Sequence, residues 1–289
     1  MAFIDVITGT SGLTHYYPLD KVHKTNDAWG GTAAAGAGYP AVNVVNQGGV
    51  TFAAKGATFT GAANSWLRAP SHRDFSVRHT PTGATGFTVF WAATITNYDQ
   101  GPKNYYMGKG CSRRGGERAP RTDGDYEWAI RLYGDPHGEQ GRNRGTSAYY
   151  WNPNPDVDDG LGSGAFIMPQ EGGGTRPPNA PAGFGDNGRE TFIGMVFTYP
   201  GSSATPGDAK LYGGFSTQQI IKINDRDLFA DAKIIPEYTV GDLSIGKRLD
   251  DDGGMFAFRM RRLAFFNRAL TLSQLRHIGD AMSLAEGIG

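Results

Sequence analysis

The stretch from Leu243 to Ala285 limits the possible folds more than any other part of the chain. Between residues 256 and 261, apolar side chains alternate with alanine or arginine in the order Phe-Ala-Phe-Arg-Met-Arg. This period of two predicts a strand with one buried and one exposed face. The phase then shifts at Arg261-Arg262, after which Leu263 and Phe265 become the apolar set. Because one extra residue exchanges the two faces of a strand, we expect a β-bulge there.

The pattern changes from strand to helix after Phe266. Thr271 and Gln274 have the spacing of a capping box, in which each side chain pairs with a backbone N–H of the other residue. Apolar residues then recur at helical spacings, namely Leu272, Leu275, Ile278, Met282 and Ala285. This stripe predicts a short amphipathic helix, Thr271–Ala285, that packs on the outside of a sheet.

The rest of the chain favours short strands over helices. Glycine accounts for 43 of the 289 residues, about twice the usual share. Apolar and polar residues alternate clearly in Glu127–Tyr133 and Thr191–Tyr199, and Gly86–Trp91 also has the composition of a strand. Many short strands separated by glycine and proline turns, with one helix, predict an all-β sandwich or barrel.

The C-terminal strand and helix resemble the signature of the LamG-like, concanavalin A-like jelly-roll family. Ile245-Gly246 and the run Asn-Arg-Ala-Leu-Thr at residues 267–271 match that signature, and Tyr-Tyr-Pro-Leu-Asp at residues 16–20 is similar to the family's opening strand. Phe258 stands where the family usually has glycine, and Arg261-Arg262 stand where it usually has an acidic pair. The resemblance implies a jelly-roll β-sandwich of two antiparallel sheets.

We expect residues 1–12 to form an N-terminal arm and residues 13–289 to form one jelly-roll domain with two long insertions. The first insertion, residues 97–122, is locally basic, and its candidate partner-docking residues are Lys103, Lys109, Arg113, Arg114, Arg118 and Arg121. Loops of this length are usually functional or disordered. The alternative is a solvated, mobile hairpin, because charge runs are often merely solvated.

The second insertion, residues 134–189, contains Tyr149, Tyr150 and Trp151, which are candidate ligand-binding residues for stacking on a sugar. The alternative is a strand that buries one of these rings in the core. Acidic residues follow at 156–159. They could meet the basic insertion of a second copy, so we expect a symmetric homo-oligomer.

One acidic run is a candidate catalytic site. Asp123, Asp125 and Glu127 would share one face of a strand, as in the acidic run of jelly-roll β-glucanases. Retaining glycosidases hold their two carboxyl groups about 5–5.5 Å apart. However, Gly124 also makes residues 122–125 resemble a hairpin turn, and we favour the turn over catalysis.

A second acidic run, Asp250, Asp251 and Asp252, is a weak candidate for Ca²⁺, which binds clustered carboxylate oxygens. Adjacent side chains alternate in direction on an extended chain, so we favour a solvated turn. We therefore expect no cofactor.

Composition excludes several other classes. Lysine plus arginine and aspartate plus glutamate each total 28, so no net charge points to nucleic acid or an anionic membrane. The single cysteine, Cys111, excludes an internal disulfide. No signal-peptide pattern and no bilayer-spanning segment occur, so we expect synthesis in a host cytoplasm and no membrane insertion.

Together these features favour a non-enzymatic binding or structural module. LamG-like domains without signal peptides occur in bacteriophage tail and capsid-surface proteins, so the resemblance implies a virion protein, either a minor tail protein or a capsid-decorating one. Its expected partners are neighbouring virion proteins and host-surface glycans. The alternative is a polysaccharide-cleaving glycoside hydrolase that uses Asp123, Asp125 and Glu127.

Overall fold

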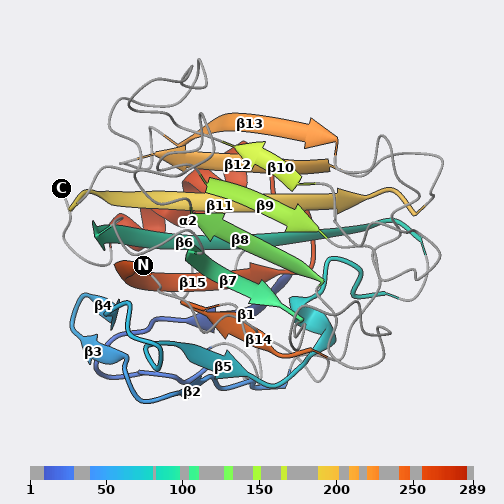
Figure 1. Cartoon of the computed structure of the whole chain (residues 1–289). Coiled ribbons are helices and arrows are strands. Elements are labelled where there is room, and N and C mark those ends of the chain that lie inside the picture. Colours follow the sequence, from blue (N-terminus) through green and yellow to red (C-terminus); the bar gives the residue numbers. More distant parts are fainter. Residues whose placement is uncertain are drawn as a thin grey trace.

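The chain folds into a sandwich of two antiparallel β-sheets, as the computed structural model in Figure 1 shows. This confirms the predicted fold class. The structure describes residues 10–28, 40–80, 83–97, 104–110, 127–132, 146–150, 164–167, 188–201, 208–214, 220–227, 241–247 and 256–284. Among these residues, no helix is both long and apolar enough to cross a bilayer.

The larger sheet has eight strands. Seven form a continuous order: β13 (Ile221–Asp227), β12 (Asp208–Gly214), β11 (Glu190–Tyr199), β6 (Thr85–Asn97), β15 (Ala257–Phe266), β4 (Gly56–Phe59) and β3 (Thr51–Ala53). The eighth, β1 (Leu13–Tyr17), pairs with residues 263–266 of β15, whereas β4 pairs with residues 258–260. Since β6 occupies the other edge of β15, β1 and β4 follow each other along the same edge.

The smaller sheet lies in front of the larger one in Figure 1 and has seven strands. Their order is β10 (Gly164–Ile167), β9 (Thr146–Tyr150), β8 (Trp128–Leu132), β7 (Asn104–Lys109), β14 (Leu243–Ile245), β5 (Leu67–Ala69) and β2 (Val45–Asn46). Three of these strands, β7, β9 and β10, fall inside the two predicted insertions. Residues 97–122, expected to be an insertion beyond the strands of the sandwich, thus include β7, which lies near the middle of this sheet.

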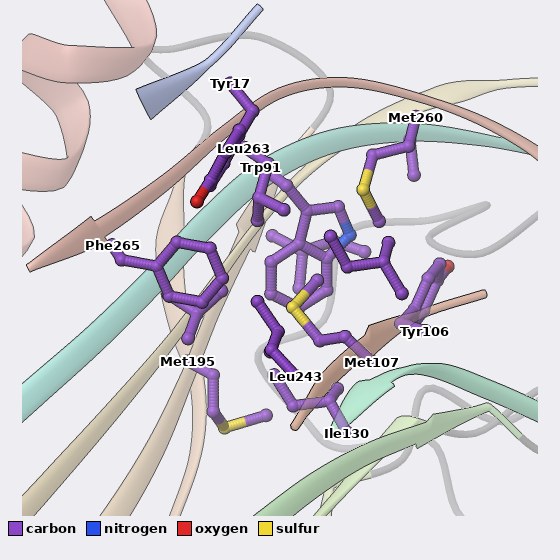
Figure 2. Packing of buried hydrophobic residues seen from close by; sticks show 14 of the residues in the cluster. Tyr17, Trp91, Tyr106, Met107, Ile130, Met195, Leu243, Met260, Leu263 and Phe265 are labelled. Atoms are coloured by element: carbon purple, nitrogen blue, oxygen red, sulfur yellow. The ribbon is translucent and has the colours of Figure 1, made fainter. Parts of the chain in front are cut away.

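The main core fills the space between the two sheets. Figure 2 shows Trp91, Met195 and Phe265 from the larger sheet facing Met107, Ile130 and Leu243 from the smaller sheet. Phe258, at the position where the jelly-roll family usually has glycine, is fully buried and stacks on Phe59 with 4.3 Å between ring centroids. Gly246 lies against the same Phe59 ring, and its φ of +88° and this contact leave no room for a side chain.

A second, smaller core lies on the outer face of the larger sheet, under helix α2 (Leu272–Leu284). Leu275, Ile278 and Ala281 of the helix pack with Phe90 and Phe192 of the sheet. The capping box is present as predicted: the Thr271 N–H donates to Gln274 Oε1 at 2.9 Å, and the Gln274 N–H donates to Thr271 Oγ1 at 3.3 Å.

The predicted bulge shifts the phase of β15, whose main-core residues are Phe258 and Met260 before it and Leu263 and Phe265 after it. The pairing of β15 with β6 shifts between Arg261 and Ala264, and Arg262 adopts a φ of +58°. Leu263 then faces the main core, whereas Ala264 and Phe266 join the core under the helix. The bulge thus keeps the main-core face of β15 apolar, because without it Arg262 would take the core position after Met260.

Candidate functional site

A short segment, residues 72–77, connects the two sheets at one end of the sandwich. It contains the 3₁₀ turn η1 (Arg73–Phe75), and Phe75 is buried in the main core. Trp128 of β8, in the smaller sheet, donates from Nε1 to the Phe75 carbonyl at 2.6 Å. Asp74 approaches His15 of β1, in the larger sheet. The segment therefore has polar contacts with both sheets.

On the larger-sheet side, His15 lies between two carboxylates. His15 is fully buried, with Nδ1 2.6 Å from Asp27 Oδ2 and Nε2 3.3 Å from Asp74 Oδ2. Asp27 is itself held by backbone donors, because the Tyr16 and Val42 N–H groups donate to it at 3.1 and 3.3 Å. These contacts fix the carboxylate on the Nδ1 side of the imidazole ring.

His72 completes this group, which we call the His–Asp cluster: His15, Asp27, His72 and Asp74. His72 Nδ1 lies 3.1 Å from Asp74 Oδ2, and its side chain is 26% exposed. The three atoms His15 Nε2, His72 Nδ1 and Asp74 Oδ2 all lie within 4.8 Å of one another. The cluster is therefore buried on the His15 side and open to solvent beside His72.

The cluster contains unsatisfied polar atoms. His15 Nε2 and Asp74 Oδ2 are both inaccessible to solvent, and neither has a hydrogen-bond partner of good geometry. Burial of such atoms without a partner is costly, so native structures contain few of them. The Phe75 ring also covers His15, with 4.7 Å between the two ring centroids.

The pKa values of the two histidines in the cluster are shifted in opposite directions. Burial alone would lower the pKa of His15, but the hydrogen bond to Asp27 and the close approach of the Asp74 carboxylate outweigh burial, so the pKa is raised. Burial lowers the pKa of His72, and the nearby Asp74 only partly opposes this shift. Burial therefore favours the neutral imidazole of His72, whose Nδ1 accepts a long hydrogen bond from the Asp74 N–H at 3.3 Å.

On the smaller-sheet side, the same segment holds a buried ion pair. Lys109 Nζ lies 2.9 Å from Glu127 Oε2, with side chains 0% and 1% exposed. Ser76 Oγ and the Val77 N–H donate to the same carboxylate at 3.0 and 3.2 Å. Glu127, one of the three catalytic candidates, is thus enclosed and paired. Burial likewise removes Lys109 from the exposed basic surface predicted for residues 97–122.

The structure places few of the other predicted site residues. Tyr149 and Tyr150 lie in β9, where they pair with Ala129 and Trp128 of β8. The other candidates lie outside the described residues: Lys103, Arg113, Arg114, Arg118, Arg121, Asp123, Asp125, Trp151, Asp250, Asp251 and Asp252.

The sequence prediction missed the His–Asp cluster. The six histidines of the chain are scattered, and no two have the spacing of a metal site. The available signal was His72-Arg73-Asp74, a histidine and a carboxylate two residues apart. Only the fold brings this pair to His15 and Asp27, because β1 pairs with β15 beside η1.

Comparison with known proteins supports the fold. No protein-family model matches the sequence, and no curated protein is similar enough to count as a relative. Among solved structures, the binding domain of Paraclostridial mosquitocidal protein 1 is similar, with 12% identity and a TM-score of 0.55 over 94% of this chain and 52% of that one. The ligand-binding domain of botulinum neurotoxin serotype D, solved with N-acetylneuraminic acid, has 8% identity and a TM-score of 0.56 over 98% of this chain and 53% of that one.

An enzyme is also among the similar structures. A Trypanosoma rangeli sialidase has 12% identity and a TM-score of 0.50 over 96% of this chain and 33% of its own. This chain thus spans about half the length of the two binding domains and a third of the sialidase. At these identities the likeness establishes a shared β-sandwich fold.

Proposed function

We propose that this protein is a non-enzymatic binding module that holds cell-surface glycans and is carried on a bacteriophage virion, as a minor tail or capsid-decorating protein. The observation that carries the glycan-binding part is the β-sandwich itself. Its fold is similar to that of toxin binding domains, one of which was solved with N-acetylneuraminic acid. Glycans are therefore the first class of ligand to test.

The state of Glu127 supports a non-enzymatic role. A glycosidase needs one carboxyl group as acid or base and a second as nucleophile or base, both beside the substrate. Glu127 is instead buried and bound to Lys109, Ser76 and Val77. We expect no release of reducing sugar from β-glucans or cell-wall polysaccharides, and release that Glu127→Gln abolishes would contradict this role.

The virion part of the proposal rests on the C-terminal signature. Residues 267–271 resemble the LamG-like domains of phage tail and capsid-surface proteins. The test is to purify particles on a density gradient and to detect the chain with an antibody in the particle fractions. Its absence from particles that contain the major capsid protein would overturn the virion assignment and leave glycan binding untouched.

A glycan array tests the binding part. We expect the intact chain to bind a defined set of glycans, and Tyr149→Ala or Trp151→Ala to weaken binding about tenfold, or about 1.4 kcal/mol, through loss of ring stacking on the sugar. Trp66→Ala is the matched control, because Trp66 is a partly exposed aromatic residue next to β5. In the strand order of the smaller sheet, β8, β7 and β14 separate β5 from β9.

The thermal midpoint of each variant separates the two interpretations of these rings. A ring used for binding can be removed with little change in stability, whereas removing a core ring costs about 3–5 kcal/mol. Equal binding by the intact chain and both variants would overturn the assignment of these residues. An array without any bound glycan would overturn the glycan-binding function.

A further inference from the structure

We propose that His15, His72 and Asp74 form a binding site for one divalent transition-metal ion of the zinc class, with Asp27 orienting His15. This site uses none of the proposed glycan-binding residues and none of residues 250–252. The ion would join β1 to the segment 72–77, and so link the edge of the larger sheet to the segment that contacts the smaller one.

The spacing of the three donor atoms fits one ion. Zn–N and Zn–O bonds of about 2.0–2.2 Å in a tetrahedral site hold neighbouring ligand atoms roughly 3.3–3.6 Å apart. Asp74 Oδ2 lies 3.3 Å from His15 Nε2 and 3.1 Å from His72 Nδ1. The third pair, His15 Nε2 and His72 Nδ1, is within 4.8 Å. A small movement of the partly exposed His72 would therefore complete the geometry.

An ion would also satisfy the atoms that the protein leaves unpaired. His15 Nε2 and Asp74 Oδ2 are buried 3.3 Å apart, and neither has a hydrogen-bond partner of good geometry. His72 Nδ1 accepts only a long bond, 3.3 Å from the Asp74 N–H, just beyond the usual range of about 2.7–3.2 Å. An ion would displace the proton that a charged His15 carries on Nε2 beside Asp74, and it would compete with only one long protein hydrogen bond, at His72 Nδ1.

Asp27 supplies the outer partner that metal-binding histidines usually have. A histidine that binds a metal through one ring nitrogen normally donates its other N–H to a carboxylate, which fixes the ring orientation. His15 Nδ1 lies 2.6 Å from Asp27 Oδ2, and Asp27 is anchored by the Tyr16 and Val42 N–H groups. With the Nδ1 proton held there, the Nε2 electron pair is directed toward Asp74.

The charges within the cluster balance when a dication is bound. Asp27 and Asp74 together carry two negative charges in a buried setting, and a protonated His15 offsets only one of them. A dication with two neutral imidazoles offsets both. Buried charges of one sign are expensive unless they are compensated, so the complete cluster favours the ion over a proton.

The donor set selects the class of ion. Two imidazole nitrogens and one carboxylate oxygen suit Zn²⁺ and its first-row neighbours, whereas Ca²⁺ and Mg²⁺ prefer sites made of oxygen atoms alone. Three protein ligands leave a coordination position for water, which solvent can reach beside His72.

Isothermal titration of the chelator-treated full chain with Zn²⁺ tests the site. We expect one ion per chain and a higher thermal midpoint with Zn²⁺ than without it. Titration with Co²⁺ should give the intense visible absorption of a low-symmetry, four-coordinate ion. Because Asp27 is an outer partner, Asp27→Asn should weaken binding roughly 10–100-fold.

His72→Ala is the decisive variant, because His72 is partly exposed and its removal leaves the buried pair of His15 and Asp27 intact. Loss of a direct ligand should weaken Zn²⁺ binding more than Asp27→Asn does, and should remove the effect of Zn²⁺ on the thermal midpoint. His23→Ala is the matched control: His23 also pairs with an aspartate, Asp20, at 3.0 Å, but on an exposed turn. We expect it to bind Zn²⁺ like the unmodified chain.

Three outcomes would overturn the site: no Zn²⁺ binding by the folded full chain, unchanged binding by His72→Ala, or equal losses in His72→Ala and His23→Ala, which would indicate adventitious surface binding only. Circular dichroism of each chain shows whether it is folded. These measurements use no glycan, so a failed metal site leaves the proposed glycan function standing, and the reverse also holds.

Discussion

At the scale of single residues, the best-defined polar feature besides the His–Asp cluster is the ion pair of Lys109 and Glu127. Both side chains are buried, and Ser76 and Val77 donate to the same carboxylate. A buried pair of this kind adds little compared with a well-packed apolar pair, but removing one partner leaves a charge in a medium that solvates it poorly. Its effect is to hold the segment 72–77 against the smaller sheet.

Lys109→Met should lower the free energy of unfolding by about 3 kcal/mol, near the low end of the range for breaking a buried pair, because Ser76 and Val77 still donate to Glu127. The double variant Lys109→Met/Glu127→Gln should lose less stability than the sum of the two single losses, since its Gln side chain is neutral and its one amide oxygen can still accept the hydrogen bond from the Val77 N–H. Urea unfolding of the unmodified chain, the two single variants and the double variant measures the coupling between Lys109 and Glu127. Strict additivity would show that the pair is not coupled.

At the scale of elements, α2 and β15 explain why the chain end determines so much of the fold. β15 contributes Phe258 and Phe265 to the main core and Phe266 to the core under the helix. The helix covers the face that would otherwise expose Phe90 and Phe192. One strand with a bulge and one capped helix thus bury apolar surface on both sides of the larger sheet.

Thr271→Ala should destabilise the protein by about 1 kcal/mol, because it removes the acceptor for the Gln274 N–H in the first turn of α2. Ser273→Ala is the control, since Ser273 is exposed in the same turn and is not part of the capping box. It should change the free energy of unfolding by less than about 0.5 kcal/mol. Chemical unfolding of the three chains decides the point, and equal effects would argue against the cap.

At the scale of the whole molecule, self-association stays a prediction that the fold now allows to be tested more cleanly. Shortening all of residues 97–122 would remove β7 from the smaller sheet. The charges that remain for a docking contact, such as Arg113 and Arg114, lie outside the described residues. Charge reversal at those positions is therefore a better variant than a deletion.

We expect sedimentation of the full chain to reveal a homo-oligomer at low salt that weakens at 1 M salt, where the screening length falls to about 3 Å. Arg113→Glu/Arg114→Glu should weaken it further, if basic side chains meet an acidic surface of a second copy. Lys21→Glu/Lys55→Glu makes the same charge change at two exposed residues elsewhere and serves as the control. A monomer at every salt concentration would contradict the homo-oligomer.

Local patterns in the sequence determined much of the larger sheet and its helix. The alternation in residues 256–266, the bulge at Arg262 and the capping box at Thr271 could all be predicted, because each depends on residues within a few positions of one another. The strand predicted over Thr191–Tyr199 also formed, as β11. A long strand with a strong apolar period can be predicted from its own residues, without knowing which strands pair with it.

Only the tertiary structure decided the rest. β7 has a weak pattern, with Asn, Gly and Lys among its six residues, and it is a strand because β14 and β8 pair with its two edges. The His–Asp cluster likewise joins residues from β1, two loops and η1. Periodicity describes the near neighbours of a residue, whereas burial, ion pairing and the approach of donor atoms depend on which distant segments the sheets bring together.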